Sequence, residues 1–179
     1  KGSPDFPDAL IGLARHSLLE KDIEAAMRFT EQATTQNPKN SGAWLFKGDL
    51  LRAQGKTEPA IAAYDQVLKM KPDNPTAHLN KAFLEISAGK FDAAKANIDA
   101  ARKASPNSLI VLYTQALLDF RMDKNAAALE SLQQILRAAP EHMPSVLLAG
   151  AVQYALGSTQ QAEQHLKHYL EKDPKNLYA

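Results

Sequence analysis

Apolar residues recur along this chain three and four positions apart, the spacing that places side chains on one face of a helix. The first such stripe contains Leu10, Leu13, Ala14 and Leu18. The pattern returns with a period of 34 residues, marked most clearly by Pro38, Pro72, Pro106, Pro140 and Pro174. A fixed period of this length indicates stacked copies of one small unit. The sequence therefore predicts five helix–turn–helix repeats, at 7–40, 41–74, 75–108, 109–142 and 143–176.

Small residues keep the same period when Ser41 is taken as position 1 of the repeat. Position 20 is alanine in all five copies: Ala26, Ala60, Ala94, Ala128 and Ala162. Gly48 and Ala60 allow two helices to approach closely, and we expect the position-20 alanines to be nearly fully buried. Gly55 permits the tight turn between the helices, and Pro72 ends the second helix. The turns are expected near 21–22, 55–56, 89–90, 123–124 and 157–158.

Asn74 and Thr57 are among the residues that carry capping signals at helix starts. Asn74 precedes Pro75, which is the pattern of a cap followed by a proline in the first turn. Thr57 is expected to cap the second helix of copy two, with Pro59 tolerated in its first turn.

Six residues of copy two stand where the tetratricopeptide repeat (TPR) places its signature residues: Trp44, Gly48, Gly55, Ala60, Tyr64 and Pro72. The chain resembles a TPR protein over nearly its whole length. The resemblance implies an all-α fold, a right-handed α-α superhelix (TPR solenoid) of five helix-turn-helix repeats, forming a single domain at 7–176. Residues 1–6 are interpreted as a tag remnant or disordered start. Residues 177–179 are interpreted as a truncated end, because TPR arrays usually finish with an extra solvating helix.

Composition excludes several functional classes. The formal net charge is +1, from 21 basic and 20 acidic residues that are interspersed, whereas nucleic-acid binding usually needs a concentrated basic face. There is no cysteine, which excludes disulfides, thiol nucleophiles and thiolate metal sites. No apolar run approaches the ~20 residues that a membrane span needs. The oligomeric state is not decided by these features.

No catalytic constellation is present in the sequence. A glycine-rich phosphate loop, a GxSxG motif and an HExxH motif are all missing. His165 and His168 are three residues apart on one helix and could share a metal, but no third ligand is evident nearby. We therefore expect no enzymatic activity, no cofactor and no metal site.

The TPR resemblance directs attention to the first helix of each repeat, where positions 2, 5, 9, 12 and 13 line a concave groove. In copies three to five these positions are mostly apolar or aromatic: Leu79, Phe83, Ile86, Tyr113, Leu117, Phe120, Arg121, Leu147 and Tyr154. A contiguous apolar surface is typical of an interaction site, and aromatic residues are good anchors. The alternative is that some of these side chains pack between neighbouring repeats. A protein or peptide segment is the expected ligand, although the lysine and asparagine residues that clamp a terminal carboxylate in chaperone-binding TPR domains are missing.

Position 11 carries polar residues in the same copies. Glu85, Asp119 and Gln153 are expected to stack as a polar ladder along neighbouring helices. Lys81 precedes Glu85 by four residues and Gln115 precedes Asp119 by four, so each can pair along its own helix. The ladder is either a set of such local pairs or a polar strip that fixes the register of a bound chain.

Three segments are similar to the TPR-repeat lipoproteins of the bacterial exosortase (PEP-CTERM) system: Tyr113–Phe120, Leu147–Leu170 and Lys172–Asn176. This resemblance implies a periplasmic or envelope-associated scaffold that acts in exopolysaccharide production or protein sorting. Two alternatives remain open. One is a cytosolic assembly or regulatory adaptor, with a cytoplasmic location. The other is a carbohydrate-binding scaffold, in which a polysaccharide would meet the aromatic residues of the groove.

Overall fold

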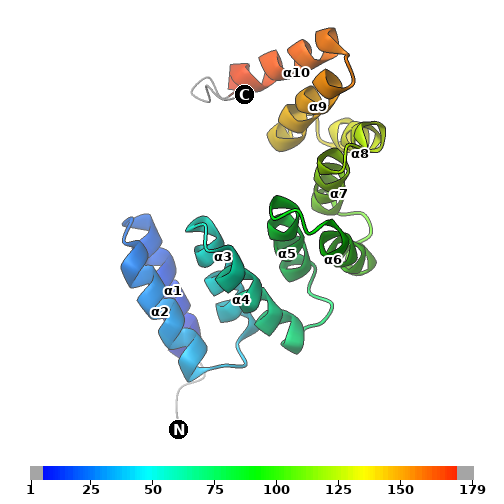
Figure 1. Cartoon of the computed structure of the whole chain (residues 1–179). Helices are drawn as coiled ribbons and strands as arrows, with labels where there is room; N and C mark the ends of the chain where they lie inside the picture. The colour runs from blue at the N-terminus through cyan, green and yellow to red at the C-terminus, as the bar shows by residue number, and fades with distance from the viewer. Residues whose placement is uncertain (1–5, 173–179) are drawn as a thin grey trace. The chain divides into compact units, whose positions relative to one another are not determined.

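The computed structural model describes residues 6–172, and within that range the chain forms ten α-helices and no strand (Figure 1). The helices form five consecutive pairs: α1 (Phe6–Leu19) with α2 (Ile23–Gln36), α3 (Ser41–Ala53) with α4 (Thr57–Met70), α5 (Pro75–Ser87) with α6 (Phe91–Ala104), α7 (Leu109–Arg121) with α8 (Asn125–Ala138), and α9 (Met143–Ala155) with α10 (Thr159–Lys172). The predicted helix pairs and turns are confirmed. The expected tag remnant or disordered start at 1–6 is wrong for Phe6, which is the first residue of α1. Residues 1–5 and the expected truncated end at 177–179 lie outside the described residues.

The chain divides into two compact units, residues 1–84 and 85–179, with the boundary inside α5. Helices α1 to α4 belong to the N-terminal unit, and helices α6 to α10 belong to the C-terminal unit. The single solenoid over 7–176 stays a prediction.

The turns between paired helices confirm the expected role of glycine. Gly55, Gly89 and Gly157 have positive φ angles of 71°, 72° and 76°. This left-handed conformation is easy only for glycine, because a Cβ atom would crowd the following carbonyl oxygen. Copies one and four lack the glycine, yet Lys21 and Asp123 adopt the same conformation with φ angles of 62° and 60°. The repeat geometry therefore imposes the turn even where the residue does not favour it.

One predicted cap is confirmed and one is wrong. The Asn74 side chain accepts a hydrogen bond from the backbone N–H of Ala77 at 2.9 Å, and α5 begins at Pro75. Thr57 is itself the first residue of α4, and the capping position falls on Lys56, which makes no capping hydrogen bond through its side chain. Thr57 is thus one residue too late to cap the helix.

The core of the N-terminal unit is built where α3 and α4 approach each other. Ala60 and Tyr64 of α4 are fully buried, and Leu51, Val67 and Ala77 join the same cluster. The Tyr64 hydroxyl donates a hydrogen bond to Asp49 at 2.8 Å. Small residues and one large ring thus fill the contact between the two helices.

The core of the C-terminal unit repeats this arrangement with aliphatic side chains. Ala116 of α7 and Ala128 of α8 are fully buried in one cluster with Leu132, Ile135 and Val152. The position-20 alanines are buried in all five copies, as predicted from the period: Ala26, Ala60, Ala94, Ala128 and Ala162.

The last helix is held to the rest of the C-terminal unit at two places. A Cβ atom built on Gly150 of α9 would lie 3.0 Å from the Leu166 side chain of α10, so the two helices are close there. On the other side, Lys172 Nζ lies 3.0 Å from Glu141 Oε2, and His168 Nε2 lies 3.4 Å from Glu141 Oε1. The Lys172 ammonium lowers the pKa of the exposed Glu141 carboxyl.

Candidate functional site

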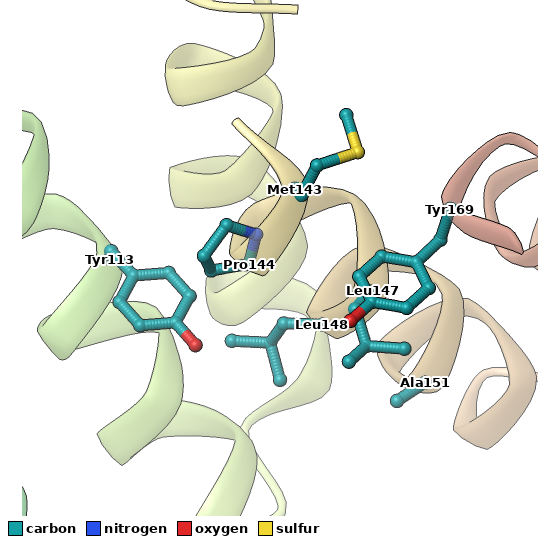
Figure 2. Close-up of a pocket in the computed structure, with 7 residues that line it drawn as sticks. All are labelled: Tyr113, Met143, Pro144, Leu147, Leu148, Ala151 and Tyr169. Carbon is teal, nitrogen blue, oxygen red and sulfur yellow. The ribbon is translucent and has the colours of Figure 1, made fainter. Parts of the chain in front are cut away.

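An apolar cavity of about 370 Å³ opens in the C-terminal unit between α7, α9 and α10. Figure 2 shows the Tyr113 and Tyr169 rings on either side of it, with the α9 side chains between them. The lining residues are Tyr113 from α7, Met143, Pro144, Leu147, Leu148 and Ala151 from α9, and Tyr169 from α10. All of them belong to one unit, so the cavity does not depend on how the two units are placed.

Helix α9 supplies most of this lining because its start is fixed locally. Pro144 occupies the first turn, where no backbone hydrogen bond is lost. The ring of His142, the residue before the helix, approaches the Ser145 hydroxyl at 2.8 Å through Nδ1. The same imidazole meets the Tyr113 ring edge-on, with centroids 5.7 Å apart and planes at 69°. Tyr113 is therefore positioned by an aromatic contact from the last residue of its own repeat, directly before α9.

Burial further disfavours ionisation of the tyrosine on this wall of the cavity. It raises the pKa of Tyr113 above its ordinary value of 10.0, because the phenolate would lose hydration. The Tyr113 phenol is therefore neutral around pH 7 and can donate a hydrogen bond. An apolar cavity edged by phenols suits a ligand with an apolar body and a polar backbone.

The structure separates the predicted groove residues into three groups. Tyr154 and Phe83 are 70% and 38% exposed, and Arg121 is also exposed. Tyr113, Leu117, Phe120 and Leu147 are half-buried, and the first three pack against the core cluster of the C-terminal unit. Tyr113 and Leu147 line the cavity together.

The third group corrects the sequence-based expectation. Ile86 has no exposed surface and Leu79 is buried, so both take packing positions and not surface ones. This is the alternative that the sequence left open. Leu79 and Phe83 also lie in the N-terminal unit, whereas the cavity belongs to the C-terminal unit.

Two of the three residues of the polar ladder, Asp119 and Glu85, accept hydrogen bonds from nearby side chains. Asp119 accepts a hydrogen bond from Gln115 at 3.0 Å, which confirms the predicted pair, and Gln115 in turn accepts one from Arg102 at 2.9 Å. Glu85 is buried and accepts a hydrogen bond from Asn97 of α6 at 2.8 Å. Lys81, the predicted partner of Glu85, forms an ion pair with Asp65 of α4.

Gln153, the third member of the polar ladder, is buried in copy five. Its Oε1 atom has no hydrogen-bond partner among the described residues. Burial leaves Asp119 as the one member of the three with partly exposed surface. Because Glu85 and Gln153 are buried, the three residues do not form a continuous polar surface that a ligand could contact in this conformation.

The sequence analysis did not name four cavity residues, Met143, Pro144, Leu148 and Tyr169, whereas Ala151 occupies position 9, one of the predicted groove positions. For Tyr169 a signal was available, because position 27 is alanine, valine or isoleucine in the other copies: Ala33, Val67, Ala101 and Ile135. An aromatic ring at that position in copy five alone marks a local departure from the repeat.

No three His, Asp or Glu side chains of residues 6–172 are grouped so that they could hold a metal ion. In that same range no helix has both the length and the apolar character needed to cross a bilayer. His165 contacts the Gln161 carbonyl through Nδ1 at 3.0 Å, which is a contact within its own helix.

Comparisons with known proteins agree with the repeat geometry. The sequence matches the family described as TPR repeat over residues 48–84 and the family described as Tetratricopeptide repeat over residues 120–179. No curated protein sequence matches the chain. The helix pairs, the period and the two matches define a helical-repeat protein of the tetratricopeptide class. The chain is a tetratricopeptide-repeat protein.

Solved structures show the same fold at low sequence identity. MamA from residue 41 to its end, from Desulfovibrio magneticus, aligns with a TM-score of 0.78 at 17% identity, over 98% of this chain and 99% of that chain. A thermophilic TPR protein from Thermus thermophilus aligns with a TM-score of 0.79 at 16% identity, over 96% and 93% of the two chains. The APC/C hetero-tetramer Cut9–Hcn1 contains a chain with a TM-score of 0.85 at 16% identity, covering 93% of this chain and 34% of that one. The fold is thus an all-α helical-repeat superhelix.

Proposed function

We propose that this protein is a non-enzymatic binding scaffold whose C-terminal unit holds an apolar side chain of a partner protein between Tyr113 and Tyr169. The observation that carries the proposal is the cavity of about 370 Å³, which is lined mainly by apolar groups. That volume lies at the small end of the range for ligand pockets, roughly 300–1,000 Å³. It suits one large side chain better than a whole cofactor.

Peptide recognition by such a site combines two contributions. The apolar side chain is removed from water, which is worth about 1.5–3 kcal/mol for a leucine- or phenylalanine-sized group. The neutral Tyr113 phenol can then donate a hydrogen bond to a carbonyl oxygen beside that side chain. Aromatic anchors of this kind often dominate the binding energy of an interface.

A selection from a phage-displayed library of random peptides tests the proposal. Enriched peptides are expected to share one large apolar residue, and their affinity is measured with synthetic, fluorescently labelled peptides. The replacement Ala151→Trp fills the cavity from α9 without removing a core side chain. It should weaken binding by about tenfold or more, corresponding to ~1.4 kcal/mol or more.

Ile110→Ala is the matched control, because Ile110 is an apolar residue of α7 that is 56% exposed and lies outside the cavity lining. It should leave the affinity unchanged. Equal affinity of the wild-type protein and the Ala151→Trp variant for the selected peptides would refute the cavity as the binding site. Retention of a polysaccharide with no peptide enriched would favour the carbohydrate-binding alternative instead.

The absence of enzymatic activity is part of the same proposal. TPR repeats serve generally as scaffolds, and no nucleophile with a paired base was found in the sequence. Turnover of a substrate by the purified protein, abolished by one point substitution, would contradict it.

We also propose that the scaffold works at the bacterial envelope, in an exosortase-linked assembly for exopolysaccharide production or protein sorting. The support is the similarity of Tyr113–Phe120, Leu147–Leu170 and Lys172–Asn176 to the TPR lipoproteins of that system. The test is fractionation of cells that produce the full-length protein from its own gene. Recovery in the periplasmic or membrane fraction is expected. Recovery in the cytosol alone would favour an assembly adaptor there.

A further inference from the structure

A cleft in the N-terminal unit lies between the second helices α2 and α4, with α3 beneath it. It consists of two adjoining hollows of about 460 Å³ and 340 Å³, which share Met27, Glu31 and Lys56. Helix α3 contributes Trp44 and Leu51 to the larger hollow. All of these residues belong to the N-terminal unit, so the cleft does not depend on how the two units are placed.

The indole ring of Trp44 is the largest side chain of this cleft. Its N–H donates a hydrogen bond to the Pro38 carbonyl oxygen at 2.9 Å, which fixes the orientation of the ring. The ring packs against the core cluster of the N-terminal unit but is only half-buried. Lys47 Nζ lies 5.3 Å from the ring centroid, within the roughly 6 Å over which a cation is attracted to an aromatic face. The ring therefore already holds a cation in the free protein.

The next junction of the same unit has the same types of charge at the same positions but pairs them differently. Lys81, at position 7 of copy three, forms an ion pair with Asp65, at position 25 of copy two. Lys47 and Glu31 occupy positions 7 and 25 at the junction of copies one and two. Lys47 lies over Trp44 instead, and within residues 6–172 the Glu31 carboxylate forms no ion pair. This junction thus leaves a carboxylate without a cation beside a ring that attracts cations.

The charges of the cleft are separated across its width. Glu24 and Glu31 are exposed on α2, whereas Lys56 is exposed on the opposite side, directly before α4. A bound segment is therefore favoured when its positive side faces α2. An arginine side chain suits this side, because its planar guanidinium stacks on an indole and presents paired N–H groups to a carboxylate. Met27 and Leu51 offer apolar surface to its methylene groups.

We propose that this cleft binds an arginine side chain of a partner protein segment, with the guanidinium stacked on Trp44 and paired with Glu31. Lys47 occupies the ring in the free protein and moves into solvent when the arginine enters. The ligand and Lys47 thus compete for one aromatic face. The cleft shares no residue with the cavity between Tyr113 and Tyr169, so this proposal stands independently of the proposed function.

Fluorescence tests the proposal directly, because Trp44 is the only tryptophan of the chain. The probes are three blocked pentapeptides, Ala-Leu-X-Leu-Ala, in which X is arginine, citrulline or glutamate. The arginine peptide should change the Trp44 emission in a saturable manner. Citrulline has the shape of arginine without its charge, so its peptide should bind about tenfold more weakly or worse, and so should the glutamate peptide.

Two substitutions should shift the affinity for the arginine peptide in opposite directions. Glu31→Gln should weaken binding by about tenfold, because the guanidinium loses its counter-ion. Lys47→Met should strengthen binding several-fold, because the competing cation is removed from the ring. The matched controls are Glu130→Gln and Lys103→Met, which make the same changes at exposed positions of α8 and α6 outside the cleft. Both should leave the affinity unchanged, and circular dichroism melts show whether each variant is folded.

Several results would overturn the proposal. One is the lack of a saturable emission change with the arginine peptide up to its solubility limit. Another is equal affinity for the arginine and citrulline peptides, which would show that the charge is not recognised. Weaker binding by Lys47→Met would mean that Lys47 contacts the ligand and does not compete with it. Preference for the glutamate peptide would assign the cleft to an acidic ligand.

Discussion

The ring of Tyr64 lies directly against the backbone of Gly48. A Cβ atom built at Gly48 would be 2.4 Å from Cε1 of that ring, closer than real Cβ contacts come. The tyrosine is fully buried and its hydroxyl is bonded to Asp49, so the ring has little room to move away. Position 8 therefore requires glycine in copy two because position 24 is an aromatic ring.

The first prediction follows from this contact. Gly48→Ala should lower the free energy of unfolding by a net amount of roughly 1–2 kcal/mol. Overpacking costs about 1–3 kcal/mol, and the better helix propensity of alanine offsets at most ~1 kcal/mol of it. Chemical denaturation followed by circular dichroism measures the change.

Gly12→Ala provides the control for helix propensity, since a Cβ atom at Gly12 would have no heavy atom within 4 Å. It should be neutral or stabilise the protein by up to ~1 kcal/mol. Gly150→Ala should fall between the two, because its Cβ would meet the flexible Leu166 side chain at 3.0 Å. A stabilising Gly48→Ala would contradict the packing argument.

The second prediction concerns alkaline pH. Burial, and then the hydrogen bond to Asp49, raise the pKa of Tyr64 well above its ordinary value of 10.0. The folded state thus favours the neutral phenol, whereas the unfolded chain ionises it above about pH 10. The contribution of Tyr64 is complete below that pH and is lost progressively as the pH rises further.

Urea denaturation at a series of pH values above neutrality tests this. The wild-type protein should lose stability more steeply above about pH 10 than the Tyr64→Phe variant. At pH 7 the variant should be less stable by ~0.5–1.5 kcal/mol, because the hydrogen bond to Asp49 is removed. Parallel pH curves for the two proteins would contradict the raised pKa, because they would mean that Tyr64 ionises equally readily in the folded and the unfolded chain.

The third prediction uses the two turns that lack glycine. Lys21→Gly should stabilise the protein by up to about 1 kcal/mol, since a left-handed residue other than glycine costs roughly 1–2 kcal/mol. Asp123→Gly should gain less, because aspartate tolerates this conformation better than lysine. Thermal melts rank the variants. Gly55→Ala is the reverse test and should destabilise, although its Cβ would meet no atom within 4 Å.

The fourth prediction separates the two kinds of alanine on α8. Ala128 is fully buried at position 20, whereas its neighbour Ala127 is exposed. Ala128→Leu should cost ~1–3 kcal/mol through overpacking against the helix it contacts. Ala127→Leu should stay within about 0.5 kcal/mol of the wild-type protein. Similar losses from both would mean that the close approach of α7 and α8 is not what position 20 protects.

The fold was predictable from the sequence because each repeat encodes its own local geometry. Alanine at position 20, the turn glycines and the periodic prolines act within a single helix pair, so the period alone places all five pairs. Thr57 was misplaced by one residue because a cap is defined by backbone angles, and the sequence carries only the residue type. The same repeat geometry holds Lys21 and Asp123 in the left-handed conformation at the two turns that have no glycine.

The site was less predictable because exposure depends on partners that are distant in sequence. Glu85 accepts a hydrogen bond from Asn97 on the next helix, a contact that its spacing from Lys81 on its own helix does not predict. Ile86 carries the same apolar signal as Leu147, but one is fully buried and the other borders the cavity. Tyr169 forms the wall of that cavity opposite Tyr113. It lies on the second helix of copy five, whereas the predicted groove comprised first helices only.

Because Tyr169 forms one wall, ligand binding in the cavity depends on a helix at the edge of its unit. Tyr169 belongs to α10, and outer repeats of such arrays open more easily than inner ones. Molecules in which α10 has detached would lack half of the aromatic enclosure, so the apparent dissociation constant would be divided by the fraction in which the helix is docked. A ligand in this cavity would consequently stabilise the docked position of α10. It should slow amide hydrogen exchange throughout that helix, while exchange in α3 and α4 stays unchanged.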